Sequence, residues 1–340
     1  MTSGCFSGRV PFIVRMVVPR EKSRDLLPSQ QVTQGRRLGL GLIRLVSLPH
    51  LHRQSMNQYL PHKPSHASNR VGFGELRARG QHSEEEYEED RGWGQEGFQY
   101  FASCTRGLEK ILAQELLAPE IGAYNVYPGH AGVRFQGSLE TGYRANLWLR
   151  SAVRVMMELA VEDLDPREPG GDAVYEFVRR LGDREWGELV PVGGTFAITS
   201  HVWDCSQIRN SALASTRVKD AVCDALRQVG RPKPMKPEFT EDVDLPLQLS
   251  LYRDRAILYR DMSGSSLHKR GYRDAMHRAS LNEAVAAGCL QLAGWPDMVR
   301  KKLKAGEDVM LMDPMCGSGT FLIEGALMAM NVAPGLMRRV

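Results

Sequence analysis

The sequence predicts an α+β amino-terminal half followed by the beginning of an α/β domain, and three observations predict this fold class. Strand-like and helix-like stretches alternate in the order β-α-β-α-β between residues 98 and 160, which favours a small ferredoxin-like unit. A second group of strands, between 195 and 261, surrounds the clearest amphipathic helix of the chain. Near residue 313, an apolar run ends in a glycine-rich turn that leads into an apolar stretch of helical length.

Residues 1–96 predict no compact fold. Residues 1–80 contain 13 Lys and Arg but three acids, a composition typical of an organelle transit segment. A disordered basic tail and a misassigned start codon are the alternatives. The acidic run at 84–90 repels itself and predicts a solvated linker. If the transit interpretation holds, we expect the chloroplast rather than the mitochondrion; otherwise we expect a cytoplasmic protein.

The ferredoxin-like unit is expected over residues 97–165. The pattern predicts strands over 98–104, 131–135 and 153–160. Thr105 can cap a first helix that ends near Leu116, and a second helix is expected over 139–149. No residue in this unit carries an obvious catalytic pattern.

A second unit is expected over residues 166–263. The pattern predicts a helical piece over 173–181, a strand over 195–202 and a long helix that Gly230 and Pro232 bring to an end. Alternating leucines from 247 to 251 predict a half-buried strand, which a turn at 253–255 joins to a partner strand over 256–261.

The last unit is expected over residues 264–340. It contains a helix and, after a strand, a glycine-rich loop at 313–320. Ser280 and Glu283 fit a capping box for a helix over 280–294. The run before Asp313 predicts a buried parallel strand, and a helix is expected over 319–330. Glycines in the intervening loop allow positive φ, and the N–H groups that open the helix can bind a carboxylate.

The loop, Asp313-Pro314-Met315-Cys316-Gly317-Ser318-Gly319-Thr320, resembles the S-adenosylmethionine loop of the RNA methyltransferases that carry a THUMP domain. The resemblance is nearest to the bacterial large-subunit rRNA guanine-N2 methyltransferases and their plant relatives. It extends to segments 217–221, 258–264 and 266–273, which resemble the second half of a THUMP domain and its exit. In that family the loop wraps the methionine and ribose of the cofactor. The resemblance therefore implies a Rossmann-like methyltransferase domain and these cofactor-binding residues: Asp313, Pro314, Cys316, Gly317, Ser318, Gly319 and Thr320.

The basic residues of the second and third units are the candidate RNA contacts. The net charge of +4 permits nucleic-acid binding without demanding it. THUMP domains bind structured RNA, so the resemblance favours RNA over ordinary solvated surface charge as the role of these residues. The predicted contacts are Arg217, Lys219, Lys233, Lys269, Arg270 and Arg273.

Composition limits the remaining possibilities. No apolar run approaches the roughly 18 residues of a membrane span, so we expect no membrane partner. The six cysteines are scattered without a Cys-x-x-Cys pair, and His201 and Cys205 have no second pair of ligands to complete a metal site. We therefore expect neither a metal nor a disulfide framework.

Some family features do not occur in the chain. The Asn/Asp-Pro-Pro-Phe/Tyr motif that holds the target base in the family is absent, since the sequence contains no Pro-Pro dipeptide. We therefore assign no catalytic residue and interpret the methyltransferase domain as truncated. A single strand cannot form a buried sheet, so the apolar residues of 321–328 should lack most of their packing partners. We therefore expect residues 304–340 to be poorly ordered or aggregation-prone in isolation and their cofactor affinity to be weak or nil.

These observations predict an RNA methyltransferase that transfers a methyl group from S-adenosylmethionine to an exocyclic amine, guanine N2 of large-subunit rRNA. A non-catalytic RNA-binding short isoform is the first alternative. A DNA adenine-N6 methylase is the second, because the amino-methylating motif is shared. A generic dinucleotide-binding protein fits least, because Gly317-Ser318-Gly319 lacks the third glycine of that fingerprint.

Overall fold

The computed structural model describes residues 97–165, 167–235, 243–273 and 280–338, together with the backbone of two strands at 12–16 and 43–47. The rest of the predicted transit segment and acidic linker lies outside the described residues. Among the helices of the described part, none has both the length and the hydropathy needed to cross a membrane.

The first unit contains the expected β-α-β-α-β elements and one additional strand. Its elements are β3 (Phe98–Cys104), α1 (Glu109–Leu116), β4 (Tyr124–Gly129), β5 (Gly132–Gly137), α2 (Leu139–Trp148) and β6 (Ala152–Asp163). β4 was not predicted, because its side chains are almost all exposed and show no apolar alternation. Ser138 caps α2, because its Oγ accepts a hydrogen bond from the Thr141 N–H. α1 begins at Glu109 without a side-chain cap, so the predicted Thr105 cap is wrong.

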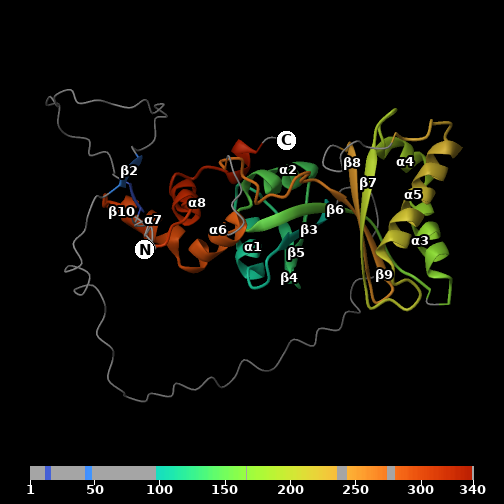
Figure 1. Ribbon diagram of the computed structural model, residues 1–340, viewed down its shortest axis with the longest axis horizontal. Helices are drawn as coiled ribbons and strands as arrows, with labels where there is room; N and C mark the ends of the chain where they lie inside the picture. Colours follow the sequence, from blue (N-terminus) through green and yellow to red (C-terminus); the bar gives the residue numbers. More distant parts are fainter. Residues whose placement is uncertain are drawn as a thin grey trace, which may run out of the picture.

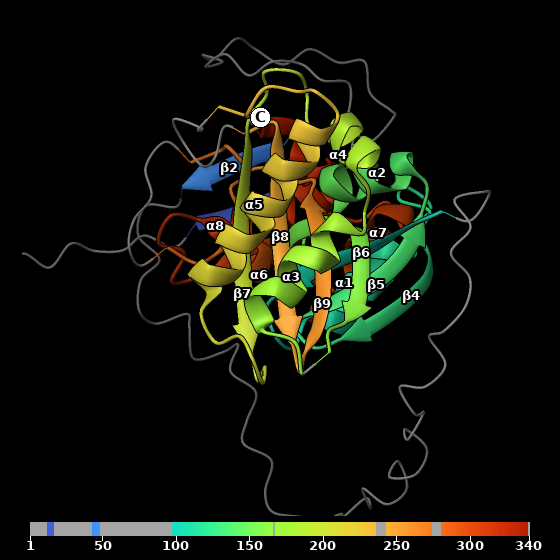
Figure 2. The ribbon, with the colours of Figure 1, turned by 90° about the vertical axis from the view of Figure 1, so that its right-hand side faces the viewer.

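The second unit follows the prediction closely and adds one short helix. Its elements are α3 (Gly170–Arg179), α4 (Asp183–Leu189), β7 (Phe196–Trp203), α5 (Ser211–Gln228), β8 (Leu245–Tyr252) and β9 (Arg255–Asp261). The leucines of β8 at 245, 247, 249 and 251 are buried in alternation, as the period of two requires. Figure 2 shows α3 and α5 in front of the strands of this unit.

The strands of both units form one seven-stranded sheet in the order β4-β5-β3-β6-β9-β8-β7. β6 joins the units, since it pairs antiparallel with β3 on one side and with β9 on the other. β7 pairs with β8 in parallel at the far edge of this sheet. Two apolar clusters pack against the sheet: α1 and α2 contribute to one with β3, β5 and β6, and α3 and α5 contribute to the other with β7, β8 and β9.

The third unit lies at the opposite end of the molecule from α3 and α5 (Figure 1). Its elements are α6 (Glu283–Leu292), α7 (Trp295–Lys304), β10 (Val309–Asp313), α8 (Thr320–Ala329) and the short 3₁₀ helix η2 (Pro334–Met337). β1 (Phe12–Met16) pairs antiparallel with β10 and with β2 (Ile43–Ser47), so a three-stranded sheet contains the loop's strand. The prediction of a buried parallel strand is therefore wrong for the described residues, and Met310 and Met312 of β10 are more than half exposed.

Two further expectations for this unit are corrected. Asn282, not Ser280, caps α6: its Oδ1 accepts hydrogen bonds from the N–H groups of Ala284 and Val285. The apolar residues of α8 do not lack packing partners, because α8 packs on α6 and α7 around Leu290, Trp295 and Val309. The expected lack of partners considered a sheet alone, whereas helices bury Leu322 and Leu327 here.

The third unit docks on the first through close backbone contacts. Leu108 packs over Gly288 of α6, where a Cβ would lie 2.5 Å from the leucine Cδ1. Gly335 of η2 lies against α2, and a Cβ there would lie 2.9 Å from both the Cα and the carbonyl oxygen of Leu147. These distances leave no room for a side chain at position 335.

Replacing Gly335 by Ala should loosen this docking, because the atoms that a Cβ would meet belong to backbone and cannot move aside. We expect a loss of about 1–3 kcal/mol, the usual cost of overpacking, measured by urea denaturation. Gly129→Ala is the matched control, since a Cβ there would find its nearest neighbour at 3.8 Å. Equal stability of the two variants would contradict the tight docking of η2.

Candidate functional site

The loop at 313–320 is a tight turn held by its own backbone. The Asp313 Oδ1 atom accepts a hydrogen bond from the Met315 N–H at 2.9 Å. The Gly319 N–H donates to the Cys316 carbonyl oxygen at 2.7 Å. Gly317 and Gly319 adopt φ values of +53° and +76°, in the left-handed region that glycine enters without steric cost. Both glycines thus adopt the positive φ that the sequence analysis allowed for them.

The loop leads directly into the amino-terminus of α8, which has no side-chain cap. Gly319 is the N-cap residue and has no side chain, so no side chain caps this helix. The N–H groups of the first turn, from Thr320 to Leu322, consequently lack intrahelical acceptors. A Cβ placed on Gly317 or Gly319 would meet no atom within 4 Å, so space is open over the loop. A ligand carboxylate or hydroxyl fits these donors and this space.

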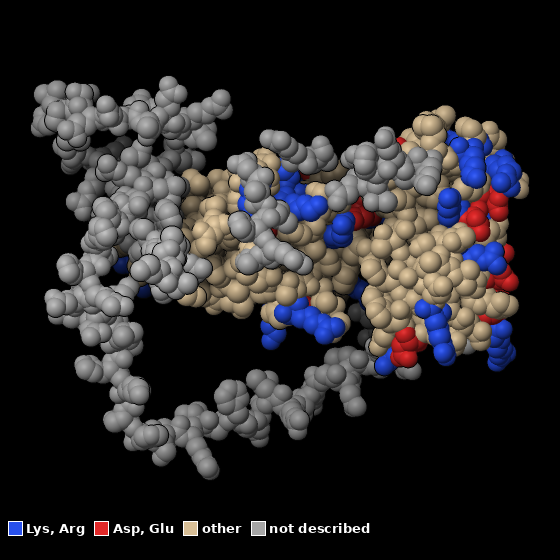
Figure 3. Space-filling view, in the orientation of Figure 1, with Lys and Arg blue, Asp and Glu red and all other residues tan. Residues whose placement is uncertain are grey.

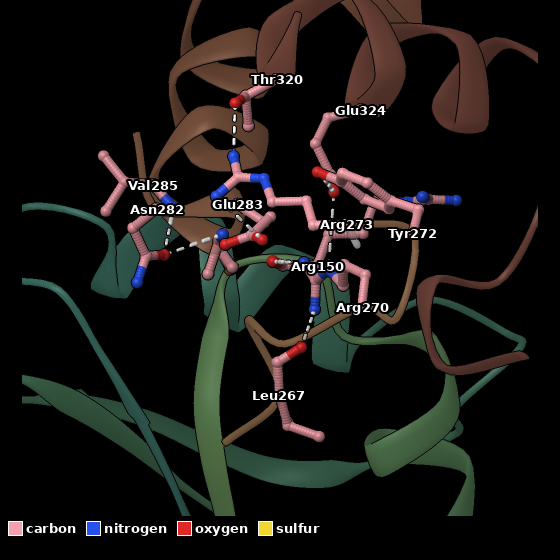
Figure 4. Close-up of polar contacts among 12 residues, drawn as sticks. Arg150, Leu267, Arg270, Tyr272, Arg273, Asn282, Glu283, Val285, Thr320 and Glu324 are labelled. Atoms are coloured by element: carbon pink, nitrogen blue, oxygen red, sulfur yellow. Dashed lines mark hydrogen bonds and ion pairs between the residues drawn. The ribbon is translucent and has the colours of Figure 1, made fainter. Parts of the chain in front are cut away.

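The back of the loop is held by a polar network, drawn in Figure 4. Arg273 donates to the Thr320 Oγ1 atom and to the Leu281 carbonyl oxygen, and its Nη1 lies 3.2 Å from the Glu283 Oε1 atom. Thr320 Oγ1 in turn lies 3.3 Å from the Ser318 Oγ atom. Thr320 is 3% exposed, so this network reaches from the buried side into the middle of the loop.

One helical turn further along α8, Glu324 is fully buried with two partners. Tyr272 donates its hydroxyl hydrogen to Oε1 of Glu324 at 3.1 Å, and the Arg270 Nε atom lies 3.5 Å from the same oxygen. Burial raises the pKa of Glu324 and outweighs the opposite effect of Arg270. The geometry agrees with this direction, because the ion pair is long and Oε2 has no hydrogen-bond partner. Burial, together with the charge on Glu324, also raises the pKa of Tyr272.

Arg150 extends the network to the first unit. Its carbonyl oxygen accepts a hydrogen bond from Arg270, and its own guanidinium donates to the Val332 carbonyl oxygen at 2.8 Å. Burial lowers the pKa of Arg150. Close by, the Glu115 carboxylate of α1 accepts hydrogen bonds from Ser151 and from the Gln291 side chain of α6. Residues of the first and third units therefore meet behind the loop, together with the segment that leaves β9.

The predicted RNA contacts separate into two groups. Lys219 and Lys233 are exposed. Both are close enough to Cys223 to affect its pKa: burial raises the pKa of the thiol, and the two ammonium groups lower it. Arg217 is half-exposed and forms an ion pair with Asp172 at 3.1 Å. Figure 3 shows Lys and Arg interspersed with Asp and Glu over the end of the molecule formed by the second unit. Lys269 is exposed but belongs to the segment that follows β9.

Arg270 and Arg273 were predicted to contact RNA, but the structure buries their side chains. The Arg270 side chain is 1% exposed and the Arg273 side chain 11% exposed. Their guanidinium groups bind the protein's own carboxylates and carbonyl oxygens, so a phosphate cannot reach them without breaking these contacts. The basic residues in the sequence do not reveal their acidic partners, Glu324 for Arg270 and Glu283 for Arg273.

Glu283, Glu324 and Tyr272 complete the site, and none of them was among the predicted cofactor or RNA contacts. Glu324 did carry a signal, since it is the one acid in an otherwise apolar helical stretch. A lone acid in such a position requires a buried partner. Across the described residues, no cluster of His, Cys, Asp and Glu could hold a metal ion.

Comparison with known families finds two matches. Residues 99–156 match the RlmL ferredoxin-like domain, and residues 270–340 match the RMKL-like methyltransferase domain. The second match contains the whole loop and the Arg273, Thr320 and Glu324 network behind it. The predicted fold class, a ferredoxin-like unit followed by the start of a methyltransferase domain, is confirmed.

Individual relatives agree with these matches. The ribosomal RNA large subunit methyltransferase K/L of Cellvibrio japonicus is 40% identical over 240 residues, and that of Syntrophotalea carbinolica is 42% identical over 239 residues. These alignments cover 71% and 70% of this chain but 30% and 31% of the relatives, so the chain spans about a third of their length.

Solved structures show the same likeness. A predicted N6-adenine-specific DNA methylase from Listeria monocytogenes superposes with a TM-score of 0.59 at 30% identity, covering 72% of this chain and 58% of that one. A putative methyltransferase complexed with SAH superposes with a TM-score of 0.57 at 27% identity, covering 72% of this chain and 59% of the other.

Replacing one member of the buried pair should destabilise the chain more than replacing both. Arg270→Met leaves the Glu324 carboxylate buried without a cation, and we expect a loss of about 3–5 kcal/mol. Arg270→Met with Glu324→Leu should recover part of that loss, because no unpaired charge remains. Urea denaturation of the wild type, both single variants and the double variant tests this. Additive losses would show that the two side chains do not interact.

Proposed function

We propose that this chain acts in methyl transfer from S-adenosylmethionine to guanine N2 of large-subunit rRNA, as a member of the THUMP-associated rRNA methyltransferases to which its sequence is similar. The observation that carries the proposal is the loop at 313–320. Its left-handed glycines and the uncapped start of α8 lie within the segment that matches the methyltransferase family.

The loop residues bind the cofactor in this proposal. The N–H groups of the first turn of α8 are suited to its carboxylate or ribose hydroxyls, and the glycines at 317 and 319 let it approach the backbone closely. S-adenosylmethionine, when bound, supplies an electrophilic methyl group on its sulfonium. Asp313 shapes the turn by accepting the Met315 N–H. We assign no described side chain to proton transfer.

The exposed lysines of the second unit bind the RNA in this proposal. Lys219 of α5 and Lys233, which follows α5, are both exposed, and both act on the charge state of Cys223, which suits contact with phosphates on this side of the second unit. Phosphate contacts hold and orient a nucleic acid without reading its bases. The choice of target nucleotide therefore lies with other residues.

Two other functions follow from particular observations. A non-catalytic RNA-binding protein is consistent with the absence of an assigned catalytic residue among the described side chains. A DNA adenine-N6 methylase is favoured by the likeness to the predicted N6-adenine-specific DNA methylase of Listeria monocytogenes, which shares 30% identity with this chain. The organelle destination remains a prediction from residues 1–80.

The experiment that tests the proposal measures binding and transfer separately. Titration calorimetry of the full chain with S-adenosylhomocysteine tests the loop, and transfer of labelled methyl to rRNA transcripts tests the reaction. Saturable cofactor binding with label on guanine N2 supports the proposal. Salt-dependent RNA binding without cofactor binding or label would replace it with the non-catalytic function, and label on DNA adenine would replace it with the methylase function.

The glycine at 319 should matter for the cofactor beyond its effect on folding. Gly319→Ala strains a residue at φ +76°, and the added Cβ enters the open space over the loop that the ligand would occupy, so we expect S-adenosylhomocysteine affinity to fall about tenfold. Gly306→Ala is the matched control, since Gly306 has φ +67° and equally open surroundings but lies outside the loop. Equal affinity of the two variants would separate the loop from cofactor binding.

Reversing the charge of both lysines should weaken RNA binding in a salt-dependent manner. Each lost phosphate contact removes roughly 0.7–0.9 from the magnitude of the slope of log affinity against log salt, so Lys219→Glu with Lys233→Glu should reduce that magnitude by about 1.4–1.8. Lys301→Glu with Lys304→Glu carries the same charge change on exposed residues of α7. Equal slopes for the two double variants would place the RNA elsewhere.

A further inference from the structure

The segment from Leu267 to Arg273 connects the seven-stranded sheet with the cofactor loop. It follows β9, and the Leu267 N–H donates to the Val153 carbonyl oxygen of β6 at 2.8 Å. Leu267 itself is 1% exposed, within the apolar cluster of the first unit. The beginning of the segment is thus fixed to the strand that both amino-terminal units share.

The end of the segment holds α8 at two points, one turn apart. Arg273 donates to Thr320, the first residue of the helix, and Tyr272 donates to Glu324. Two contacts on the same side of a helix, four residues apart, limit both its rotation and its displacement along its axis. Figure 4 shows these side chains converging on α8.

Arg273 is the member of this set that touches the loop. It bridges Thr320 and Glu283, and Glu283 stands at the start of α6, directly after the Asn282 cap. Because Glu283 is 3% exposed, the carboxylate keeps the guanidinium in place from the opposite side. Thr320 Oγ1 lies 3.3 Å from Ser318 Oγ, so the contact extends to the serine between the two glycines.

We propose that Arg273 is a positioning residue for the cofactor loop, which it holds through Thr320 in the conformation that presents the α8 N–H groups to the ligand. The proposal rests on the assignment of this loop to S-adenosylmethionine. Arg273 does not touch the space in front of the loop, because it approaches from the buried side. The segment therefore links the position of the loop to the sheet that carries the candidate RNA contacts.

The first test is hydrogen exchange of the loop in the full chain without ligand. Arg273→Ala should accelerate exchange of the amides in 315–323 about tenfold or more, and Arg273→Lys should restore part of the protection because it retains the charge. Arg180→Ala is the matched control, since Arg180 of the second unit pairs with Glu162 of β6 and neither residue contacts the loop. Unchanged exchange in 315–323 for Arg273→Ala would overturn the proposal.

A second pair of variants keeps the test decisive if Arg273→Ala fails to fold. Thr320→Val removes the acceptor while retaining the shape of the side chain and the Arg273–Glu283 pair, and Thr320→Ser retains the acceptor. We expect faster loop exchange in the valine variant and near wild-type exchange in the serine variant. Equal exchange in the two variants would show that the Arg273–Thr320 bond does not hold the loop.

Binding measurements separate this proposal from the proposed function. Where the wild type binds S-adenosylhomocysteine, Arg273→Ala should lower the affinity at least about tenfold and leave RNA affinity unchanged. Weakened RNA binding with unchanged cofactor affinity would overturn the proposal and return Arg273 to the RNA contacts. If the wild type binds no S-adenosylhomocysteine, the cofactor part of the proposed function fails, and the exchange comparison still decides whether Arg273 positions the loop.

Discussion

A guanidinium and a carboxylate that are both withdrawn from water, those of Arg270 and Glu324, hold α8 against the segment that leaves the large sheet. Neither charge could remain buried alone, because transfer of an unpaired ion from water costs several kcal/mol. Neighbouring groups therefore satisfy both side chains. Tyr272 donates a hydrogen bond to Glu324, and Arg270 donates hydrogen bonds to the carbonyl oxygens of Leu267 and Arg150. The carboxy-terminal unit is ordered because this polar centre and the apolar cluster around Trp295 form together.

The same centre explains why the loop is not an independent peptide. Its front consists of backbone that any ligand with a carboxylate or hydroxyl can approach, but its back consists of side chains supplied by other parts of the chain. Gln291 of α6 and Ser151 after α2 share the Glu115 carboxylate of α1. Small residues at 288 and 335 allow the helices of the first and third units to approach closely. The geometry of the loop is thus a property of the whole described chain.

Much of this fold could be predicted from local patterns. In β8, for example, apolar residues occur at every second position of the sequence, and these are the side chains that the sheet buries. The turn at Gly317 and Gly319 could be predicted because backbone with positive φ favours glycine, so the residue type indicates the conformation. The partners of Arg270 and Arg273 were not, because charge alone does not report burial. α7 was not predicted, because it begins directly where the helix expected over 280–294 ends: Gly294 lies in the left-handed region after α6, and Pro296 stands in the first turn of the next helix. The antiparallel partner of β10 lies almost 300 residues away, beyond any local pattern.

The sharing of β6 has a consequence for how such a protein can change over time. β6 pairs with β3 through residues 152–157 and with β9 through residues 156–163, so removing either neighbour exposes that part of the strand as an edge to other chains. The ferredoxin-like unit and its neighbour would have to be duplicated, fused or lost as a pair. Insertions would be tolerated in the loops beyond the strand ends, and recombination within the sheet would not.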